Sequence, residues 1–307
     1  MIRNKKCFKY GISYNLQKMM KKGRKKMMTR ITKIGILKVG CVGTLPLLEF
    51  LLDERAERTD IDVRVMGSGA ELGPEQCRET TELMIKQNMG LIILIGPAQT
   101  APGPTEARKM LKTTRIPTIV ISDSPAKKVV KDMEEAGLGY IIVEADSMIG
   151  ARREFLDPTE MALYNSDVIR VLAITGAFNL VVQEIDKVIG AVKVGAKPEV
   201  PRVVIDGEKA VEAAGFSNPY AKAKAMSSYE IARQVSSVTT KACFTVTDKE
   251  VYVHLVAVAH EMMRTAARLA DEARECEKAG DQVFRKPHFT DGTLGTKRKL
   301  MEKPKRK

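Results

Sequence analysis

Five short apolar runs, separated by helical patterns, constrain the fold of this chain more than any other feature. The runs lie at residues 33–37, 63–66, 91–95, 118–121 and 140–143, and amphipathic helical patterns fill the segments near 45–56, 74–88, 104–113 and 125–136. Strands that are apolar throughout are typical of a parallel sheet with helices on both faces. The alternation therefore predicts a doubly wound α/β domain with a mainly parallel sheet.

Beyond residue 157 the pattern changes to longer helical stretches. Asp157 can accept hydrogen bonds from the first-turn amides, and Pro158 suits the first helical position. The expected long helices span 158–193, 218–237 and 248–279, with extended segments only at 202–205 and 243–246. We therefore expect an α/β ligand-binding domain at 28–155, followed at 156–289 by a mainly helical domain with a small amount of strand.

The positive charge of the chain is concentrated at its two ends. Of the net charge of +13, residues 1–28 hold +10 and residues 293–307 hold +6, so the remaining body carries −3. A nucleic-acid-binding domain would place its basic residues on a folded face, although a basic-tailed nucleic-acid-binding protein remains an alternative. We interpret residues 1–27 as a basic leader, disordered or a start-site artefact, and 290–307 as a basic tail, for which disorder is the simplest interpretation.

The spacing of the cysteines and the lengths of the apolar runs indicate the cellular compartment of the protein. The longest strongly apolar stretch, at 91–95, is far shorter than the ~20 residues of a membrane span, and the leader lacks the apolar core of a secretory signal. The cysteines are widely spaced, with no pattern that suggests zinc, and are expected to be free thiols: Cys7, Cys41, Cys77, Cys243 and Cys276. The sequence predicts a cytoplasmic protein without a membrane segment or a metal.

The loops after the strands are the expected location of a ligand site, because open parallel sheets bind ligands outside the carboxyl ends of their strands. The loop at 96–104 holds three prolines and two glycines, which suits either ligand binding or a rigid crossover. The candidate ligand-binding residues in these loops are Lys38, Gly40, Gly43, Thr44, Gly67, Ser68, Gly96, Pro97, Ser122, Asp123 and Arg152.

The first loop only partly matches the glycine fingerprint of nicotinamide-binding proteins. Gly40 and Gly43 fit its last two glycines, but Lys38 occupies the first position. The second strand also ends at Gly67 rather than at the acid that holds the ribose hydroxyls. Both features argue against a nicotinamide cofactor. The structural interpretation is that Gly43 allows close helix packing and that Thr44 caps the following helix.

Adjacent arginines at positions 152 and 153 form the densest cluster of charge near the expected crevice. Neighbouring side chains point in different directions, so at most one arginine is expected to face a ligand while the other pairs with Glu154 or Glu160. A surface ion-pair network would show the same pattern, and exposed pairs contribute only ~0 to 1 kcal/mol. Charge alone therefore assigns no function to this cluster.

Several long segments resemble one enzyme family. Residues 33–44, 51–56, 101–104 (APGP), 137–143, 149–161 (IGARREFLDPTEM) and 218–226 are similar to archaeal deazaflavin-dependent methylenetetrahydromethanopterin dehydrogenases. The resemblance runs from about residue 28 to about residue 288. Family members begin a few residues before the first strand, so Met28 is the expected initiator and residues 1–27 lie outside the pattern.

The resemblance implies an activity and an assembly. The activity is reversible hydride transfer between 5,10-methylenetetrahydromethanopterin and the deazaflavin coenzyme F-420, which gives the methenyl cation and reduced coenzyme in methanogenesis and one-carbon metabolism. The assembly is a homo-oligomer, specifically a homohexamer built as a trimer of dimers. The alternative enzyme is a nicotinamide-dependent dehydrogenase on the same fold.

Such chemistry suggests roles for the charged candidates. Carboxylates near the pterin would favour the developing cation, with Asp146, Glu154 and Asp157 as candidates, whereas no side-chain acid, base or metal is required. Lys38, Arg152 and amides at helix starts would receive the phosphate and carboxylates of the coenzyme.

Overall fold

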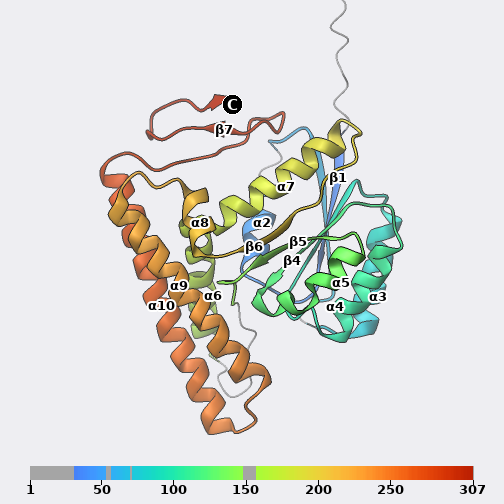
Figure 1. Cartoon of the computed structure of the whole chain (residues 1–307), viewed down its shortest axis with the longest axis horizontal. Coiled ribbons are helices and arrows are strands. Elements are labelled where there is room, and N and C mark those ends of the chain that lie inside the picture. Colours follow the sequence, from blue (N-terminus) through green and yellow to red (C-terminus); the bar gives the residue numbers. More distant parts are fainter. Residues whose placement is uncertain (1–30, 53–56, 70, 148–156, 307) are drawn as a thin grey trace, which may run out of the picture. The chain divides into compact units, whose positions relative to one another are not determined.

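A six-stranded parallel sheet forms the centre of the protein (Figure 1). The computed structural model describes residues 31–52, 57–69, 71–147 and 157–306, and residues 31–307 form one compact unit. The strand order is β2-β1-β3-β4-β5-β6. The strands are β1 (Thr32–Lys38), β2 (Ile61–Gly67), β3 (Leu91–Ile95), β4 (Thr118–Asp123), β5 (Gly139–Val143) and β6 (Arg202–Ile205). The expected α/β fold is confirmed, with each strand at its expected place.

Helices cover both faces of the sheet, which explains why its strands are apolar throughout. Alternate side chains of β3 enter different cores: Ile93 packs on one face, and Ile92 and Leu94 pack on the other. The first face carries α2 (Thr44–Leu52), α6 (Pro158–Thr175) and α7 (Ala177–Lys193). The second carries α3 (Pro74–Lys86), α4 (Pro102–Lys112), η2 (Ser124–Val129) and α5 (Val130–Glu135) (Figure 1).

The second half of the chain contributes both helices and one strand. After β6 come α8 (Gly207–Ala214), α9 (Pro219–Phe244) and α10 (Lys249–Ala279), of which α9 and α10 pack side by side as a long pair (Figure 1). Because β6 completes the sheet, the boundary expected near residue 155 separates two patterns of secondary structure within one compact unit.

The prediction of an extended segment at 243–246 is wrong. Helix α9 continues through Phe244, and Thr245 ends it. Cys243 and Val246 pack against the main core from this helix end. Their alternating apolar character therefore reflects contacts at the last helical turn rather than a strand.

A glycine divides the single helix expected at 158–193. Gly176, with φ +99°, separates α6 from α7, and the chain of helices bends by 67° at this point. A Cβ atom at Gly176 would overlap the carbonyl oxygen of Ala210, so glycine also allows α8 to approach the bend. Among the described helices none alone is long and apolar enough to cross a membrane; only the bent α6–α7 pair has the combined length and composition.

The C-terminal segment is ordered against the body, which its basic composition did not predict. Thr59 N donates to Thr290 O at 2.7 Å, and Lys193 Nζ donates to Asp291 O at 3.0 Å. Strands β7 (Gly295–Thr296) and β8 (Lys305–Arg306) form a small antiparallel pair. These contacts attach the segment to the amino edge of β2 and to the end of α7.

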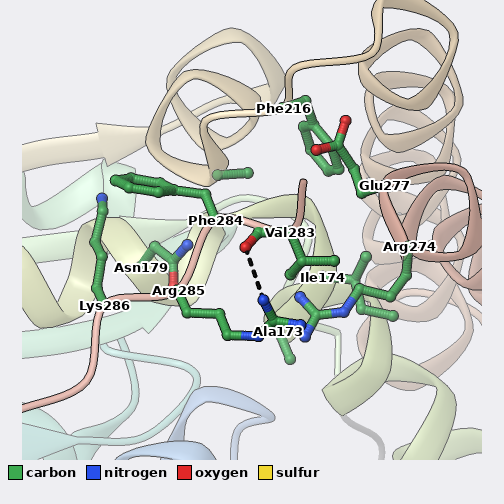
Figure 2. Close-up of a pocket in the computed structure, with 11 residues that line it drawn as sticks. Ala173, Ile174, Asn179, Phe216, Arg274, Glu277, Val283, Phe284, Arg285 and Lys286 are labelled. Atoms are coloured by element: carbon green, nitrogen blue, oxygen red, sulfur yellow. Dashed lines mark hydrogen bonds between the residues drawn. The ribbon is translucent and has the colours of Figure 1, made fainter. Parts of the chain in front are cut away.

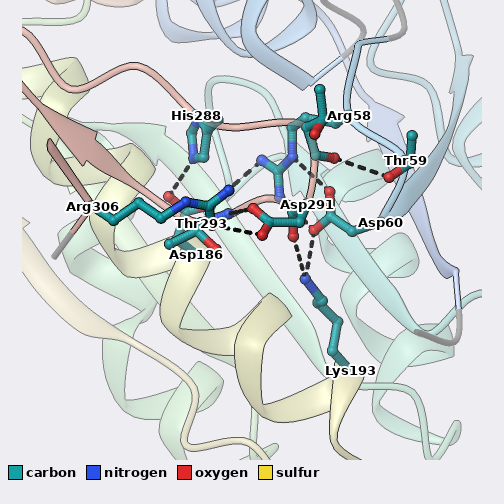
Figure 3. Close-up of polar contacts among 10 residues, drawn as sticks. Arg58, Thr59, Asp60, Asp186, Lys193, His288, Asp291, Thr293 and Arg306 are labelled. Atoms are coloured by element: carbon teal, nitrogen blue, oxygen red, sulfur yellow. Dashed lines mark hydrogen bonds and ion pairs between the residues drawn. The ribbon is translucent and has the colours of Figure 1, made fainter. Parts of the chain in front are cut away.

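Asp60 is the centre of the polar network that holds this segment (Figure 3). Its buried carboxylate receives two hydrogen bonds of 3.0 Å from Arg58 and one of 2.9 Å from Lys193. Burial by itself raises the pKa of Asp60, but the hydrogen bonds and charges of Arg58 and Lys193 outweigh it and lower this pKa below its usual value. Nearby, His288 Nε2 lies 2.7 Å from Asp186 Oδ2.

Asp60→Asn is expected to lower the free energy of unfolding at pH 7 by about 3 kcal/mol, because it removes the buried counter-charge of Lys193 and leaves Arg58 only its longer 3.7 Å pair with Asp186. A carboxylate whose pKa is lowered in the folded state stabilises the fold at pH values above its pKa in the unfolded chain, about 3.9. This contribution is lost as the pH falls through the pKa of the folded state. Urea unfolding at pH 7 and pH 3 measures both effects. The control, Asp62→Asn, removes the exposed pair with Arg64 and should cost at most about 1 kcal/mol. Equal losses for both variants would contradict the assignment.

Candidate functional site

The strand order reverses between β1 and β3, and this switch point defines the candidate site. The loop after β1 leads to α2 on one face, and the loop after β3 leads to α4 on the other. Val39 N donates to Ile95 O at 2.9 Å, and Gly96 N donates to Ile121 O at 3.1 Å, so the strand ends remain paired up to the point where the loops diverge. Such a divergence leaves a crevice outside the carboxyl ends of the strands.

Glycines let the loops after β1 and β3 approach each other closely. A Cβ atom at Gly96 would overlap the carbonyl oxygen of Val39, so no other residue fits there. Gly40 has φ +73°, and a Cβ atom on it would lie 3.1 Å from Pro97. Glycine at both positions therefore lets the loops after β1 and β3 pack closely at the carboxyl edge of the sheet.

Asp146 joins the loop after β5 to the start of α2. Its Oδ1 accepts from Gly43 N at 2.6 Å, and its Oδ2 accepts from Thr44 N at 2.8 Å and from Thr44 Oγ1 at 2.6 Å. The residue is 1% exposed, so these contacts stand in for solvent around its carboxylate. The helix cap that we expected from Thr44 is thus supplied by a residue more than a hundred positions away, at the positive end of the helix dipole.

Gly43 has the packing role that the sequence suggested. A Cβ atom there would lie 2.7 Å from Val168 of α6 and 3.0 Å from Asp146 Oδ1. Glycine at this position therefore lets α6 and the Asp146 carboxylate approach the first loop together.

Asp123, the last residue of β4, places a partly buried carboxyl group beside the loop after β3. Its Oδ1 accepts from Ala98 N at 3.3 Å and lies 3.0 Å from Ser122 Oγ. Burial, with a smaller contribution from the Asp146 carboxylate, raises the pKa of Asp123 to about 6 against the opposing effect of its hydrogen bonds. This carboxyl group therefore changes charge just below neutral pH.

The loop at 96–104 is braced from beneath by two residues that sequence reasoning missed. Fully buried Gln99 donates from Nε2 to Gly96 O at 3.0 Å, and Arg108 Nη1 donates to Gln99 Oε1 at 2.8 Å. Ser122 Oγ lies 2.7 Å from the same Gly96 oxygen. Arg108 resembles any surface arginine of an amphipathic helix in the sequence, so no local signal indicated this role.

Lys38 is the last residue of β1 and brings a positive charge to this edge of the sheet. Its aliphatic chain lies against Gly67, where a Cβ atom would overlap it. Within the described part of the chain its ammonium group has no hydrogen bond or ion pair. Ser68 closes the neighbouring loop by donating from N to Lys38 O at 3.1 Å and from Oγ to Glu71 O at 2.8 Å. The positive charge of Lys38 therefore lies at the carboxyl end of β1.

Of the remaining candidates, Asp157 has a local capping contact and the others lie outside the described residues. Asp157 is exposed and caps α6 through Thr159 N at 2.8 Å. Arg152 and Glu154 lie outside the described residues, so their roles stay predictions. Across the described ranges, no group of three or more His, Cys, Asp or Glu side chains is arranged to hold a metal ion.

A switch point where two glycine-containing loops meet, with Lys38 and Asp123 at neighbouring strand ends, is the place where α/β proteins of this topology bind organic ligands. Comparison with known proteins identifies the family. The family model described as methylene-5,6,7,8-tetrahydromethanopterin dehydrogenase matches residues 32–305. This chain belongs to that family.

Individual relatives match over nearly their whole length. The F420-dependent methylenetetrahydromethanopterin dehydrogenase of Methanothermobacter marburgensis is 53% identical over 274 residues, which cover 89% of this chain and 99% of the relative. The enzyme of the same name from Archaeoglobus fulgidus is 54% identical over 274 residues, with the same coverage of each chain.

One solved structure is also similar. It is an F420 dependent methylene-tetrahydromethanopterin dehydrogenase in complex with methylene-tetrahydromethanopterin and coenzyme F420. The TM-score is 0.86 at 46% identity, and the match covers 90% of this chain and 100% of the other.

Asp123→Asn is expected to raise the free energy of unfolding at pH 7 by about 2 to 3 kcal/mol, because it removes a carboxylate that burial disfavours. A carboxyl group whose pKa is raised in the folded state contributes stability that is fully present below its pKa in the unfolded chain, about 3.9. This contribution is lost as the pH rises through the folded-state pKa of about 6. Denaturant titrations should therefore show the variant and the wild type converging at pH 4. A variant less stable than the wild type at pH 7 would show that the ionised group is stabilising.

Proposed function

We propose that this protein transfers a hydride reversibly between 5,10-methylenetetrahydromethanopterin and oxidised coenzyme F-420. The observation that carries the proposal is family membership over almost the whole length of the relatives, which are named for this dehydrogenase activity. A similar solved structure holds both molecules together. The nicotinamide alternative lacks support, because the end of β2 is glycine and the named relatives use F420.

The chemistry requires orientation more than side-chain reactivity. The methylene carbon lies between two nitrogens whose lone pairs help expel the hydride and stabilise the methenyl cation that remains. When bound, the coenzyme supplies the acceptor: it gains the hydride at C5 and takes up one proton. The protein must therefore hold two planar ring systems face to face and exclude water from between them.

The loops at the switch point support a site for flat ligands with anionic groups. We propose that the backbone at Gly40, Gly96 and Pro97, together with the loop at Gly67 and Ser68, forms the surface on which one ring system lies. Lys38 binds a negatively charged group of the coenzyme or substrate, and Arg152 supplies a second such contact. Gly43, Thr44 and Ser122 act by fixing the loops, since their polar contacts are internal.

Electrostatic stabilisation of the cation is assigned chiefly to Asp123. Its carboxylate is partly exposed beside the crevice, whereas that of Asp146 is buried and hydrogen-bonded to the first loop. Asp146 is thus a positioning residue that adds negative potential from a distance. Glu154 and Asp157 remain proposed contributors to the same potential.

We also propose a homohexamer and a cytoplasmic location. Large apolar side chains are exposed on the long helices, including Leu163, Phe244 and Val251, which supports burial of this surface between subunits. The described cysteines are all free thiols, which suits a reducing compartment.

Substrate deuterated at the transferred methylene position should deliver deuterium to C5 of the coenzyme without exchange with water, because the transfer is direct. The assay follows loss of the oxidised coenzyme absorbance, and mass spectrometry of the product locates the label. NAD or NADP in place of the coenzyme is the control and should give no turnover. Solvent hydrogen at C5 in the first turnover would overturn direct transfer, and the absence of any absorbance change would overturn the proposed function.

A further inference from the structure

A second pocket lies among the helices of the second half of the chain (Figure 2). It is bounded by the α6–α7 bend, the end of α8, α10 and residues 283–286, and its volume is about 190 Å³. A single water needs only ~10 to 15 Å³ of such space, so the pocket can hold a polyatomic ion with its waters. None of the residues assigned to the crevice lines this pocket.

Two guanidinium groups converge in this pocket. Arg274 of α10 and Arg285 of the following segment extend toward one another beneath Val283 (Figure 2). Arg285 donates from Nη1 to the backbone oxygens of Val283, at 3.2 Å, and Arg298. Arg274 is half-buried, yet in the part of the chain that the structure describes it has no hydrogen bond or ion pair.

The two arginines disfavour each other's charge. Burial lowers the pKa of Arg274, and the nearby charge of Arg285 lowers it further. An arginine nevertheless remains protonated at neutral pH, so both groups stay positive. Like charges at close range in a partly buried site are costly unless an anion lies between them.

The pocket's one acidic lining residue does not supply that anion. Glu277 accepts from Ser217 N at 2.9 Å and from Asn218 N at 2.7 Å, and Ser217 Oγ also donates to it. The Glu277 carboxylate thus interacts with the backbone amides before the start of α9. Figure 2 shows its carboxylate turned away from the two guanidinium groups, beside Phe216.

We propose that this pocket binds a phosphate-sized oxyanion between Arg274 and Arg285. A planar guanidinium fork matches the spacing of two oxygens on a tetrahedral oxyanion. Arg274 offers its whole guanidinium group, and Arg285 offers the nitrogens other than Nη1, which already donates to Val283 and Arg298. A bound anion would join α10 to residues 283–286, and through Arg285 and Arg298 to the C-terminal segment. The inference goes beyond the proposed function, because it concerns a separate site and does not depend on turnover.

Calorimetric titration of the full chain with inorganic phosphate, at constant ionic strength maintained with chloride, tests the site. Arg274→Gln should weaken phosphate binding by roughly tenfold or more, because charge-assisted hydrogen bonds are lost. Arg268→Gln is the matched control: it removes the same charge from an exposed position on the same helix and should bind like wild type. Arg274→Lys, which keeps the charge but loses the fork, should fall between them.

Three results would overturn the proposal. Wild-type protein could show no phosphate binding beyond that of chloride, or the Arg274 and Arg268 variants could bind equally. Alternatively, Arg274→Gln could change the oligomeric state in sedimentation while phosphate binds to neither form, which would show that Arg274 pairs with an acidic group of a second copy. Normal hydride transfer in the variant would not affect the conclusion, since binding is measured directly.

Discussion

The carboxylate of Asp146 is the interaction on which the geometry of the candidate site depends. It binds two backbone amides and one hydroxyl at the start of α2, and it is buried beneath the loop after β1. A buried carboxylate is tolerated only when its oxygens are hydrogen-bonded. The hydrogen bonds that make the burial of Asp146 possible therefore also hold Gly43 and Thr44 in place. They fix the loops after β1 and β5 relative to each other.

The rest of the crevice follows from this constraint and from the sheet topology. Glycines allow the loops after β1 and β3 to approach each other closely, and Gln99 and Arg108 stiffen the second of these loops. Lys38 and Asp123 then present opposite charges on either side of the switch point. A rigid site of this kind suits a reaction in which two ring systems exchange a hydride and the protein supplies alignment and potential.

Local patterns predicted the strands and the helices flanking them, because hydrophobic periodicity reports which faces are buried. Strand ends in turn located Lys38, Gly96 and Asp123, since parallel strands share one carboxyl edge. Contacts between distant segments could not be predicted in the same way. Nothing near Asp146 in the sequence indicates that it caps α2, and the basic composition of residues 290–306 conceals their attachment to Asp60.

Hydrogen exchange of the backbone amides, with and without both ligands, tests the central claim most directly. If the crevice holds the two ring systems, exchange should slow in the loops at 38–43 and 96–101 and beside Asp123 when methylenetetrahydromethanopterin and coenzyme F-420 are both bound. The α9–α10 pair should change less, apart from contacts between subunits. Protection confined to the helices, with both loops exchanging at the rate of the free protein, would contradict the account.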